Sequence, residues 1–374
     1  MFKNKKELKS IEDILVLISD TDISDLTIQI LDSIKQSGLN PCVEIHDLGN
    51  PKIYHDLTEL GFKCRKVKRH RKIFFPLAII RLIFRISESK YKTVYSSGQY
   101  SCLIGLTSSF ICRVPKRIYT RHHTDSNYSY SNRNLRMLRG FIFDKTCNLL
   151  ATKIIAVSQV VKDFMITHEN VFPGKVTVIN NSVSKKFLAD TASNVPSDKI
   201  RIGVVSRLTS IKGVEYIAEA FVAYYLENNN CQLTVVGADS DSSAAIHKIL
   251  GQLPLEVYNF IPRLTDVHSF YNEIDVFIHA PISETAEAFG LVYLESLFAG
   301  LYCIFTKSGI IGKDEELQEL CKIVDYKDSQ SILQAIREYS FSAKTRKVIP
   351  QKVLQRYSTA KMKNSYSEIW KSKI

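Results

Sequence analysis

Two glutamates lie eight positions apart in a stretch whose pattern predicts a strand, a polar loop and a helix. This segment, residues 275–300, reads DVFIHAPISETAEAFGLVYLESLFAG and opens with an apolar run typical of a buried strand. Glu287 lies in the polar loop, and Glu295 lies about one turn inside the predicted helix. Carboxylates accept hydrogen bonds from hydroxyl groups, and the free backbone N–H groups at Phe289–Leu291 can hold phosphate oxygens. The loop is therefore expected to bind a ligand with hydroxyls and phosphate, unless Glu287 merely caps the loop and Glu295 faces solvent.

Two cations follow another predicted strand. In the segment GVVSRLTSIKG, Arg207 comes directly after the strand and Lys212 precedes Gly213 and a predicted helix. Arginine offers a bidentate fork and lysine a mobile point charge, so the pair suits a diphosphate. Two basic residues in a loop are also common where a loop only faces solvent.

Two adjacent histidines, His122 and His123, follow the predicted strand RIYT, beside Arg121 and Asp125. A histidine at a strand end is often structural, but two in tandem favour a role in binding or catalysis. Successive side chains at a strand end point in opposite directions, so only one should face a ligand, and we favour His122. Gly98, at the end of another predicted strand, is expected to line the same cleft.

Strand-like and helical patterns alternate along the whole chain, which predicts α/β architecture with mainly parallel sheets. A polar stretch between Ser182 and Ile200 interrupts the alternation and predicts a linker. We therefore predict two Rossmann-like, doubly wound domains, residues 1–185 and 198–356, facing each other across a cleft. Ligands of such sheets bind beyond the carboxyl ends of the strands, where the loops described above would lie.

The segment EAFGLVYLE resembles the E-x-F-G-x-x-x-x-E signature of the family 4 retaining glycosyltransferases, and GVVSRLTSIKG resembles their G-R-L-x-x-x-K-G motif. The resemblance implies the two-domain GT-B fold and transfer of a sugar from a nucleoside diphosphate sugar to an acceptor, with retention of configuration. It also implies that the chain from about Tyr357, residues 357–374, packs back on the first domain. No metal or other cofactor is implied.

The resemblance also assigns roles to residues. The predicted catalytic residues are Glu287, at the hydroxyls of the donor sugar, and the pair His122 and His123. The predicted substrate-binding residues hold the pyrophosphate, the ribose or the base, or line the cleft; they are Arg207, Lys212, Phe289, Gly290, Leu291, Glu295, Ile261 and Gly98. One departure is the loop after the first predicted strand, residues 18–26, which contains no glycine, so a close backbone approach to a ligand is not expected there.

The chain carries 50 Lys and Arg against 38 Asp and Glu, a net charge of +12 that favours an anionic partner. A basic run leads into an apolar segment within residues 63–85, as in a peripheral anchor on anionic lipid, although charge runs are usually only solvated. Since many family members use lipid-linked acceptors, we expect a glycan or polyprenyl-linked acceptor and contact with a membrane. The eight cysteines lack metal-site spacing, and the apolar start resembles a first strand rather than a signal peptide. Both features favour a cytoplasmic protein, and the expected membrane contact would make it peripheral on the inner face of the cell membrane.

Two alternatives share some of these features. A sugar-nucleotide 2-epimerase has the same fold and substrates but needs no acceptor. A nucleic-acid-binding protein would account for the positive charge, but the sequence has no recognised nucleic-acid module, and aromatic residues do not interleave with the basic run. We therefore expect no nucleic-acid partner.

Overall fold

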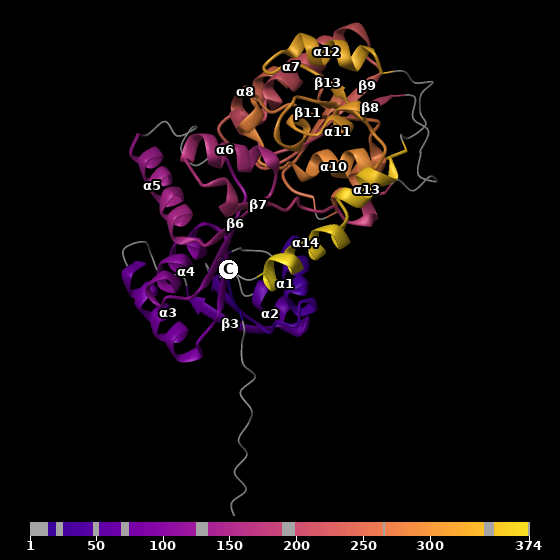
Figure 1. The fold of residues 1–374 in the computed structure, drawn as a ribbon. Coiled ribbons are helices and arrows are strands. Elements are labelled where there is room, and N and C mark those ends of the chain that lie inside the picture. Colours follow the sequence, from indigo (N-terminus) through magenta and orange to yellow (C-terminus); the bar gives the residue numbers. More distant parts are fainter. Residues whose placement is uncertain are drawn as a thin grey trace, which may run out of the picture.

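The protein consists of two α/β domains joined at one side, with the first domain below and the second above in Figure 1. The computed structural model describes residues 14–19, 25–47, 52–68, 75–124, 134–188, 199–264, 266–339 and 348–372. Parts of the predicted linker, of the loop after the first strand and of the basic run, as well as Asp125, lie outside the described residues.

The first domain contains a seven-stranded parallel sheet in the order β3-β2-β1-β4-β5-β6-β7. Its strands are β1 Ile14–Ile18, β2 Pro41–Asp47, β3 Lys63–Lys68, β4 Thr93–Ser97, β5 Lys116–Arg121, β6 Lys153–Ala156 and β7 Val176–Val178. The connecting helices are α1 Asp25–Gln36, α2 Lys52–Glu59, α3 Phe75–Ser89, α4 Gln99–Ile111, α5 Asn134–Leu150 and α6 Gln159–Glu169. The central strand β1 is buried along its whole length, as expected where helices cover both faces of a parallel sheet.

The second domain contains a six-stranded parallel sheet in the order β10-β9-β8-β11-β12-β13. Its strands are β8 Ile200–Val205, β9 Cys231–Val236, β10 Tyr258–Ile261, β11 Val276–His279, β12 Tyr302–Phe305 and β13 Lys322–Ile323. Its helices are α7 Val214–Glu227, α8 Ser243–Leu250, α9 Val267–Glu273, α10 Leu291–Phe298, α11 Glu315–Glu319, α12 Ser329–Arg337 and α13 Gln351–Arg356.

The strand order of each sheet reverses once, between β1 and β4 in the first domain and between β8 and β11 in the second. At such a point the loops after the two central strands turn to opposite faces of the sheet and leave a crevice for a ligand. In the second domain these loops hold Arg207 and Lys212, after β8, and Glu287, after β11. The predicted doubly wound fold therefore brings these residues to one edge of the sheet.

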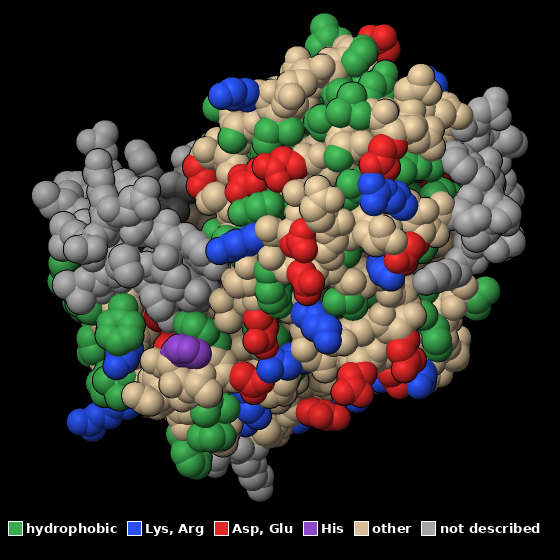
Figure 2. All heavy atoms as spheres, turned by 90° about the horizontal axis from the view of Figure 1, so that it is seen from above, with side chains coloured by type: hydrophobic (Ala, Val, Ile, Leu, Met, Phe, Trp, Pro, Cys, Tyr) green, Lys and Arg blue, Asp and Glu red, His purple; other side chains and the backbone are tan. Residues whose placement is uncertain are grey.

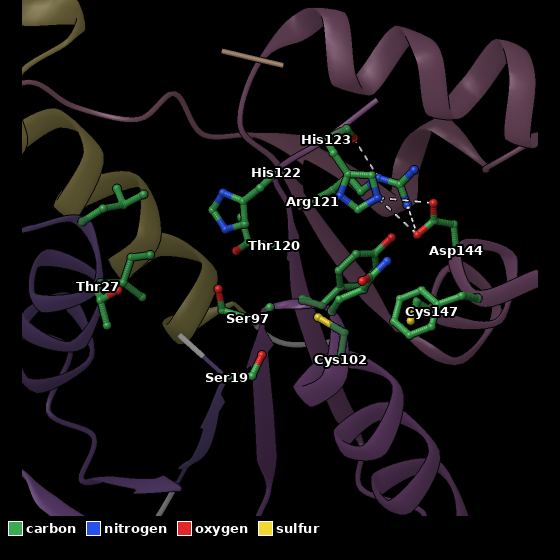
Figure 3. A pocket seen from close by; sticks show the side chains of 16 residues that line it. Ser19, Thr27, Ser97, Cys102, Thr120, Arg121, His122, His123, Asp144 and Cys147 are labelled. Carbon is green, nitrogen blue, oxygen red and sulfur yellow. Dashed lines mark hydrogen bonds and ion pairs between the residues drawn. The ribbon is translucent and has the colours of Figure 1, made fainter. Parts of the chain in front are cut away.

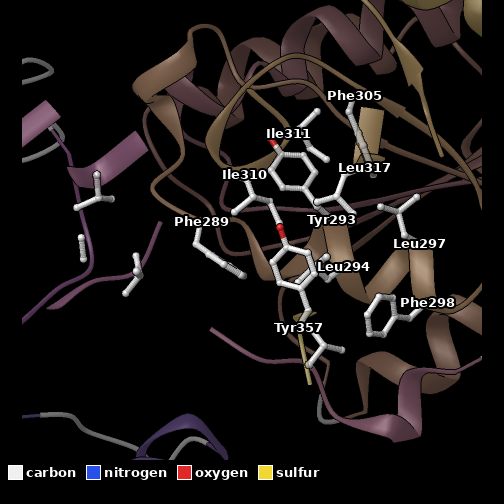
Figure 4. Close-up of a cluster of buried hydrophobic side chains, with 14 of the residues drawn as sticks. Phe289, Tyr293, Leu294, Leu297, Phe298, Phe305, Ile310, Ile311, Leu317 and Tyr357 are labelled. Atoms are coloured by element: carbon white, nitrogen blue, oxygen red, sulfur yellow. The ribbon is translucent and has the colours of Figure 1, made fainter. Parts of the chain in front are cut away.

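Helix α10, which follows Glu287, is held in place by a large apolar cluster (Figure 4). Phe289, Tyr293 and Leu297 from this segment pack with Phe305 of β12 and with Ile311, and all five are at most 3 % exposed. Gly290 begins the helix with a φ of +81°, a left-handed conformation that glycine adopts at little cost. The loop with Glu287 is therefore anchored by the core at its helical end.

The C-terminal helix α14, Thr359–Lys371, returns to the first domain and lies against α1. Trp370 donates a hydrogen bond from Nε1 to Ser33 Oγ at 2.8 Å, and its ring packs edge-on against Tyr95. The buried Lys116 donates from Nζ to the carbonyl oxygens of Ile369, Trp370 and Ser372 at 2.5, 3.0 and 2.8 Å. The last carbonyls of a helix lack partners within the helix, and a cation there also interacts favourably with the helix dipole.

We expect Lys116→Met to destabilise the first domain by about 2 kcal/mol, because it leaves buried carbonyl groups without their charged donor. The measurement is urea unfolding followed by tryptophan fluorescence, since Trp370 lies at this contact. Lys371→Met, which removes an exposed cation from the same helix, is the matched control and should change stability by less than about 0.5 kcal/mol. Equal effects of both substitutions would contradict the capping role of Lys116.

Candidate active site

A cavity of about 500 Å³ lies between the two domains, at the switch point of the second sheet. The second domain supplies most of its wall, and the first domain contributes His122, Val157 and Asn181. Seven residues predicted from the sequence line it together: His122, Arg207, Lys212, Glu287, Phe289, Gly290 and Leu291. The structure thus brings together residues that are up to 169 positions apart in the sequence.

Glu287 is the centre of the charged contacts in this cavity. Its Oε1 accepts hydrogen bonds from Nζ of Lys212 and, at 3.0 Å, from Nε2 of His279. Burial alone would raise the pKa of Glu287, but the hydrogen bond from His279 and the charge of Lys212 outweigh it and hold the pKa at about 2. The carboxylate is therefore ionised throughout the physiological pH range.

The backbone next to Lys212 explains how the lysine reaches Glu287. Gly213 has a φ of +65°, and a Cβ at this position would lie 2.1 Å from the carbonyl oxygen of Ala280. Only glycine allows this close approach, which brings Lys212 to the end of β11. Lys212 is 8 % exposed, whereas Arg207 is exposed at the cavity wall. Lys212 is thus paired with a carboxylate, which the sequence did not predict.

Three predicted binding residues lie outside the lining of this cavity: Glu295, Ile261 and Gly98. The Glu295 carboxylate accepts a hydrogen bond from the Tyr271 hydroxyl at 3.1 Å, and burial raises its pKa. The Ile261 carbonyl accepts a hydrogen bond from the N–H of Gly237 at 2.9 Å, and only the residues after it, from Pro262, reach the cavity.

The two histidines lie on different sides of the chain after β5 (Figure 3). His122 lines the interdomain cavity and also an adjoining cavity of about 690 Å³ in the first domain, which His123 and Gly98 line as well. The His122 side chain is exposed where it lines these two cavities. Loss of hydration at the cavity wall and the neighbouring His123 lower the pKa of His122, which favours the neutral ring at pH 7.

His123 belongs to a buried ionic network instead. Its Nε2 lies 3.3 Å from both carboxylate oxygens of Asp144. Arg121, which is 1 % exposed, pairs with Asp144 and with Glu169 at 2.7 Å each. The guanidinium thus balances two buried carboxylates, and its charge is already matched before any ligand enters the first-domain cavity.

The first domain contacts the loop around Glu287 directly. Thr124 donates from Oγ1 to the Thr285 carbonyl at 2.6 Å, and Ser158 donates from Oγ to the Ala288 carbonyl at 2.5 Å. These hydrogen bonds lie on either side of Glu287 in the sequence. The conformation of the loop therefore depends on both domains.

Among the lining residues that were not singled out from the sequence as site residues, three have side chains that can form hydrogen bonds and follow or end a strand: Asn181, Arg263 and His279. Each follows or ends a strand, as a polar residue at the end of an apolar run. This signal also marks many ordinary loops, so it could have suggested the three residues but not distinguished them.

The described part of the chain lacks two further features. No group of three or more His, Cys, Asp or Glu side chains there is arranged to hold a metal ion. No helix among the described residues is long and apolar enough to cross a membrane.

The low pKa of Glu287 predicts a pH-dependent stability. A carboxyl group whose pKa falls from 4.5 to about 2 on folding stabilises the protein above pH 4.5, and this contribution is lost as the pH falls from 4.5 to 2. Glu287→Gln should therefore destabilise the protein at pH 7 by up to about 3 kcal/mol. The difference from wild type should shrink steadily below pH 4.5.

The measurement is urea unfolding at pH 7, 5 and 3.5. Glu284→Gln is the matched control, because Glu284 lies in the same loop but forms a half-exposed pair with Lys313; its cost should stay below about 1 kcal/mol. A cost of Glu287→Gln that is the same at all three pH values would contradict an ionised Glu287 in the folded state.

Comparison with known proteins identifies the family. The family model for glycosyltransferase family 4 matches residues 49–187, and the model for glycosyl transferases group 1 matches residues 186–353. The capsular polysaccharide biosynthesis glycosyltransferase CapM of Staphylococcus aureus is 27 % identical over 249 residues. That match spans 62 % of this chain and 62 % of CapM, less than two thirds of its length.

Solved structures share the fold over nearly the whole chain. The Anabaena protein Alr3699/HepE, solved in complex with UDP and glucose, superposes with a TM-score of 0.77 at 19 % identity and covers 97 % of this chain and 100 % of its own. A glycosyltransferase from Rickettsia africae ESF-5 gives a TM-score of 0.73 at 18 % identity and covers 96 % and 98 %. The predicted GT-B fold is thus confirmed. The two adjoining family matches, which together span residues 49–353, show that the chain belongs to the family 4 glycosyltransferases.

Proposed function

We propose that the protein transfers a sugar from a nucleoside diphosphate sugar to a hydroxyl group of a glycan or polyprenyl-linked acceptor, with retention of configuration, in the synthesis of a cell-surface polysaccharide. The observation that carries this proposal is the cavity in which Glu287, Lys212 and Arg207 meet at the switch point of the second sheet. The name of CapM and the UDP and glucose bound to HepE support the same substrate class.

The donor would lie with its diphosphate between the cations and the beginning of α10. Arg207, Lys212 and Arg263 all line this cavity. The beginning of α10, at Leu291 and Val292, lines it as well, and the first N–H groups of a helix have no partners within the helix. Three cations and a helix N-terminus can neutralise a diphosphate as it leaves, which is the work that a divalent cation does in other transferases. We therefore propose that transfer needs no metal ion.

The sugar would lie between Glu287 and His122. The ionised Glu287 can accept hydrogen bonds from sugar hydroxyls and stabilise positive charge that develops on the ring. The neutral His122, which lines both cavities, lies where the donor sugar and the acceptor would meet. Glu295, which accepts a hydrogen bond from Tyr271 through Oε2, would bind the ribose with its remaining acceptor capacity.

The acceptor would enter through the cavity of the first domain. Hydroxyl groups of Ser19, Thr27 and Ser97 and apolar side chains of Leu26 and Ile30 are part of its wall. Such a mixed surface suits a sugar, which offers hydroxyl edges and apolar faces.

Contact with an anionic membrane is proposed for the face formed by β3 and α3. Residues 1–185 hold 29 of the 50 Lys and Arg but only 16 of the 38 Asp and Glu, a net +13 that leaves residues 186–374 at −1. Helix α3 exposes Leu77, Ile80 and Phe84 along one side, and Lys63, Arg65, Lys66 and Arg81 are exposed nearby in the sequence. Figure 2, which looks onto the second domain, shows Lys and Arg interspersed with Asp and Glu instead. The face with exposed basic and apolar residues belongs to the first domain, which is the domain proposed to bind the acceptor. A lipid-linked acceptor would require that this domain contact the membrane.

The direct test is a screen of purified protein against nucleotide sugars, with and without added glycan or lipid-linked acceptors. Formation of a glycosidic product that depends on the acceptor, with the donor's anomeric configuration by NMR, is the expected result. Conversion of the donor without any acceptor would identify a 2-epimerase and overturn the proposal.

A nucleoside diphosphate should stabilise the protein in the presence of EDTA. At a concentration 100 times its dissociation constant, the ligand adds about 2.7 kcal/mol to the free energy of unfolding, which thermal melting detects easily. Arg207→Ala should reduce this stabilisation, whereas Arg337→Ala, which removes an exposed arginine of α12, should leave it unchanged. The donor site is wrongly assigned if UDP, GDP, ADP and dTDP all fail to shift the melting temperature, or if Arg207→Ala has no effect.

Neutralising Arg65, Lys66 and Arg81 to Gln should weaken binding to anionic vesicles on the order of a hundredfold, since each charge near the surface contributes about 1 kcal/mol. Vesicle sedimentation measures this, with Lys248, Lys307 and Lys327→Gln, exposed cations of the second domain, as the matched control. A loss of the same size in the control, or no binding of wild type at low salt, would contradict a membrane-binding face.

A further inference from the structure

His279 is a buried polar residue next to Glu287 to which neither the sequence pattern nor the family resemblance gave a role. It is the last residue of β11, is 2 % exposed, and places Nε2 3.0 Å from Glu287 Oε1. Lys212 binds the same oxygen. Two donors of different kinds, a neutral ring and a cation, therefore hold one carboxylate oxygen.

The surroundings of His279 fix both its position and its proton. Its ring packs edge-on against Tyr293, with the ring centroids 5.0 Å apart, and Tyr293 in turn lies directly beneath Gly290. Nδ1 is buried and has no hydrogen-bond partner among the described residues. Protonation of Nδ1 would bury an unpaired N–H, so the ring is neutral and carries its hydrogen on Nε2, which donates to Glu287.

Lys212 cannot hold Glu287 in the same way throughout the proposed reaction. A diphosphate in this cavity carries more negative charge than one carboxylate and competes for the same ammonium group. When Lys212 turns to the diphosphate, Glu287 loses the stronger of its two partners just as the donor sugar arrives. His279 has no such competitor, because it is neutral and fixed at the end of a strand.

We propose that His279 is a positioning residue for Glu287: it keeps the carboxylate in place while Lys212 passes from Glu287 to the donor diphosphate. The inference rests on the proposed function, since it assumes a diphosphate at Lys212. His279 would therefore affect kcat only through the position of Glu287, and it would not contact the diphosphate.

Kinetics of two substitutions test this assignment. His279→Leu removes the donor group at similar volume, and we expect kcat to fall about tenfold to a hundredfold, because a displaced catalytic group loses its alignment. The dissociation constant of UDP should stay within about twofold of wild type. His279→Gln keeps an N–H donor and should recover most of kcat. Ile278→Val, on the neighbouring buried position of β11, is the matched control for a general disturbance of the strand and should leave kcat unchanged.

A double-mutant cycle separates positioning from a merely structural role. If His279 acts through Glu287, adding His279→Leu to Glu287→Gln should lower kcat by less than about threefold further. Independent, multiplying losses would overturn the proposal, as would equal losses in His279→Gln and His279→Leu or a loss of UDP binding in step with kcat.

The same cycle in thermal melting needs no activity. Glu287→Gln should lower the melting temperature less in the His279→Leu background than in wild type, since the hydrogen bond is already gone. Additive shifts would refute the coupling of His279 and Glu287. A coupled cycle in a protein that transfers no sugar from any donor would instead refute the proposed function and leave the contact itself established.

Discussion

The ion pair between Glu287 and Lys212 is the interaction on which the candidate active site depends. A carboxylate with little solvent contact is stable as an anion only if hydrogen bonds and an opposite charge replace its hydration. Lys212 supplies the charge, and it reaches Glu287 because Gly213 lets the chain pass so close to Ala280 that a Cβ on residue 213 would lie only 2.1 Å from the Ala280 carbonyl oxygen. The cavity is therefore charged and preorganised before a donor arrives, and the donor must exchange one of these contacts for its own.

The conformation of the loop with Glu287 is determined from three sides. Helix α10 anchors its end in the apolar cluster around Tyr293, His279 holds the carboxylate from the strand end, and Thr124 and Ser158 of the first domain donate to its carbonyl groups. A change in the angle between the domains would break the last two hydrogen bonds. The first domain thus contributes to the geometry of a site whose charged groups belong almost entirely to the second.

The sequence predicted the fold because its signals are local: alternating strands and helices, and a polar break between two such series. It also singled out seven of the residues that line the cavity, because motifs at strand ends of a doubly wound sheet converge at the switch point. It did not predict which partners individual side chains contact. Glu295 contacts Tyr271, and His123 binds Asp144, since the rotation of a helix and the course of a loop follow from packing between distant segments. The sequence did not predict a role for His279, because a polar residue at the end of an apolar strand has no distinctive spacing.

The two domains differ in how their positive charge is distributed. Nearly the whole net charge of the chain lies in residues 1–185, yet the arginine nearest the first-domain cavity, Arg121, is already balanced by Asp144 and Glu169. The positive charge of this domain is therefore not directed at a small anion in its cavity and is available on its outer surface. The second domain is nearly neutral overall and places Arg207, Lys212 and Arg263 around one cavity. The proposed attraction of the first domain to an anionic surface and the proposed binding of a diphosphate by the second domain can then act without interfering. Charges on the outer surface are screened by salt within about 10 Å, whereas those in the cavity are screened much less.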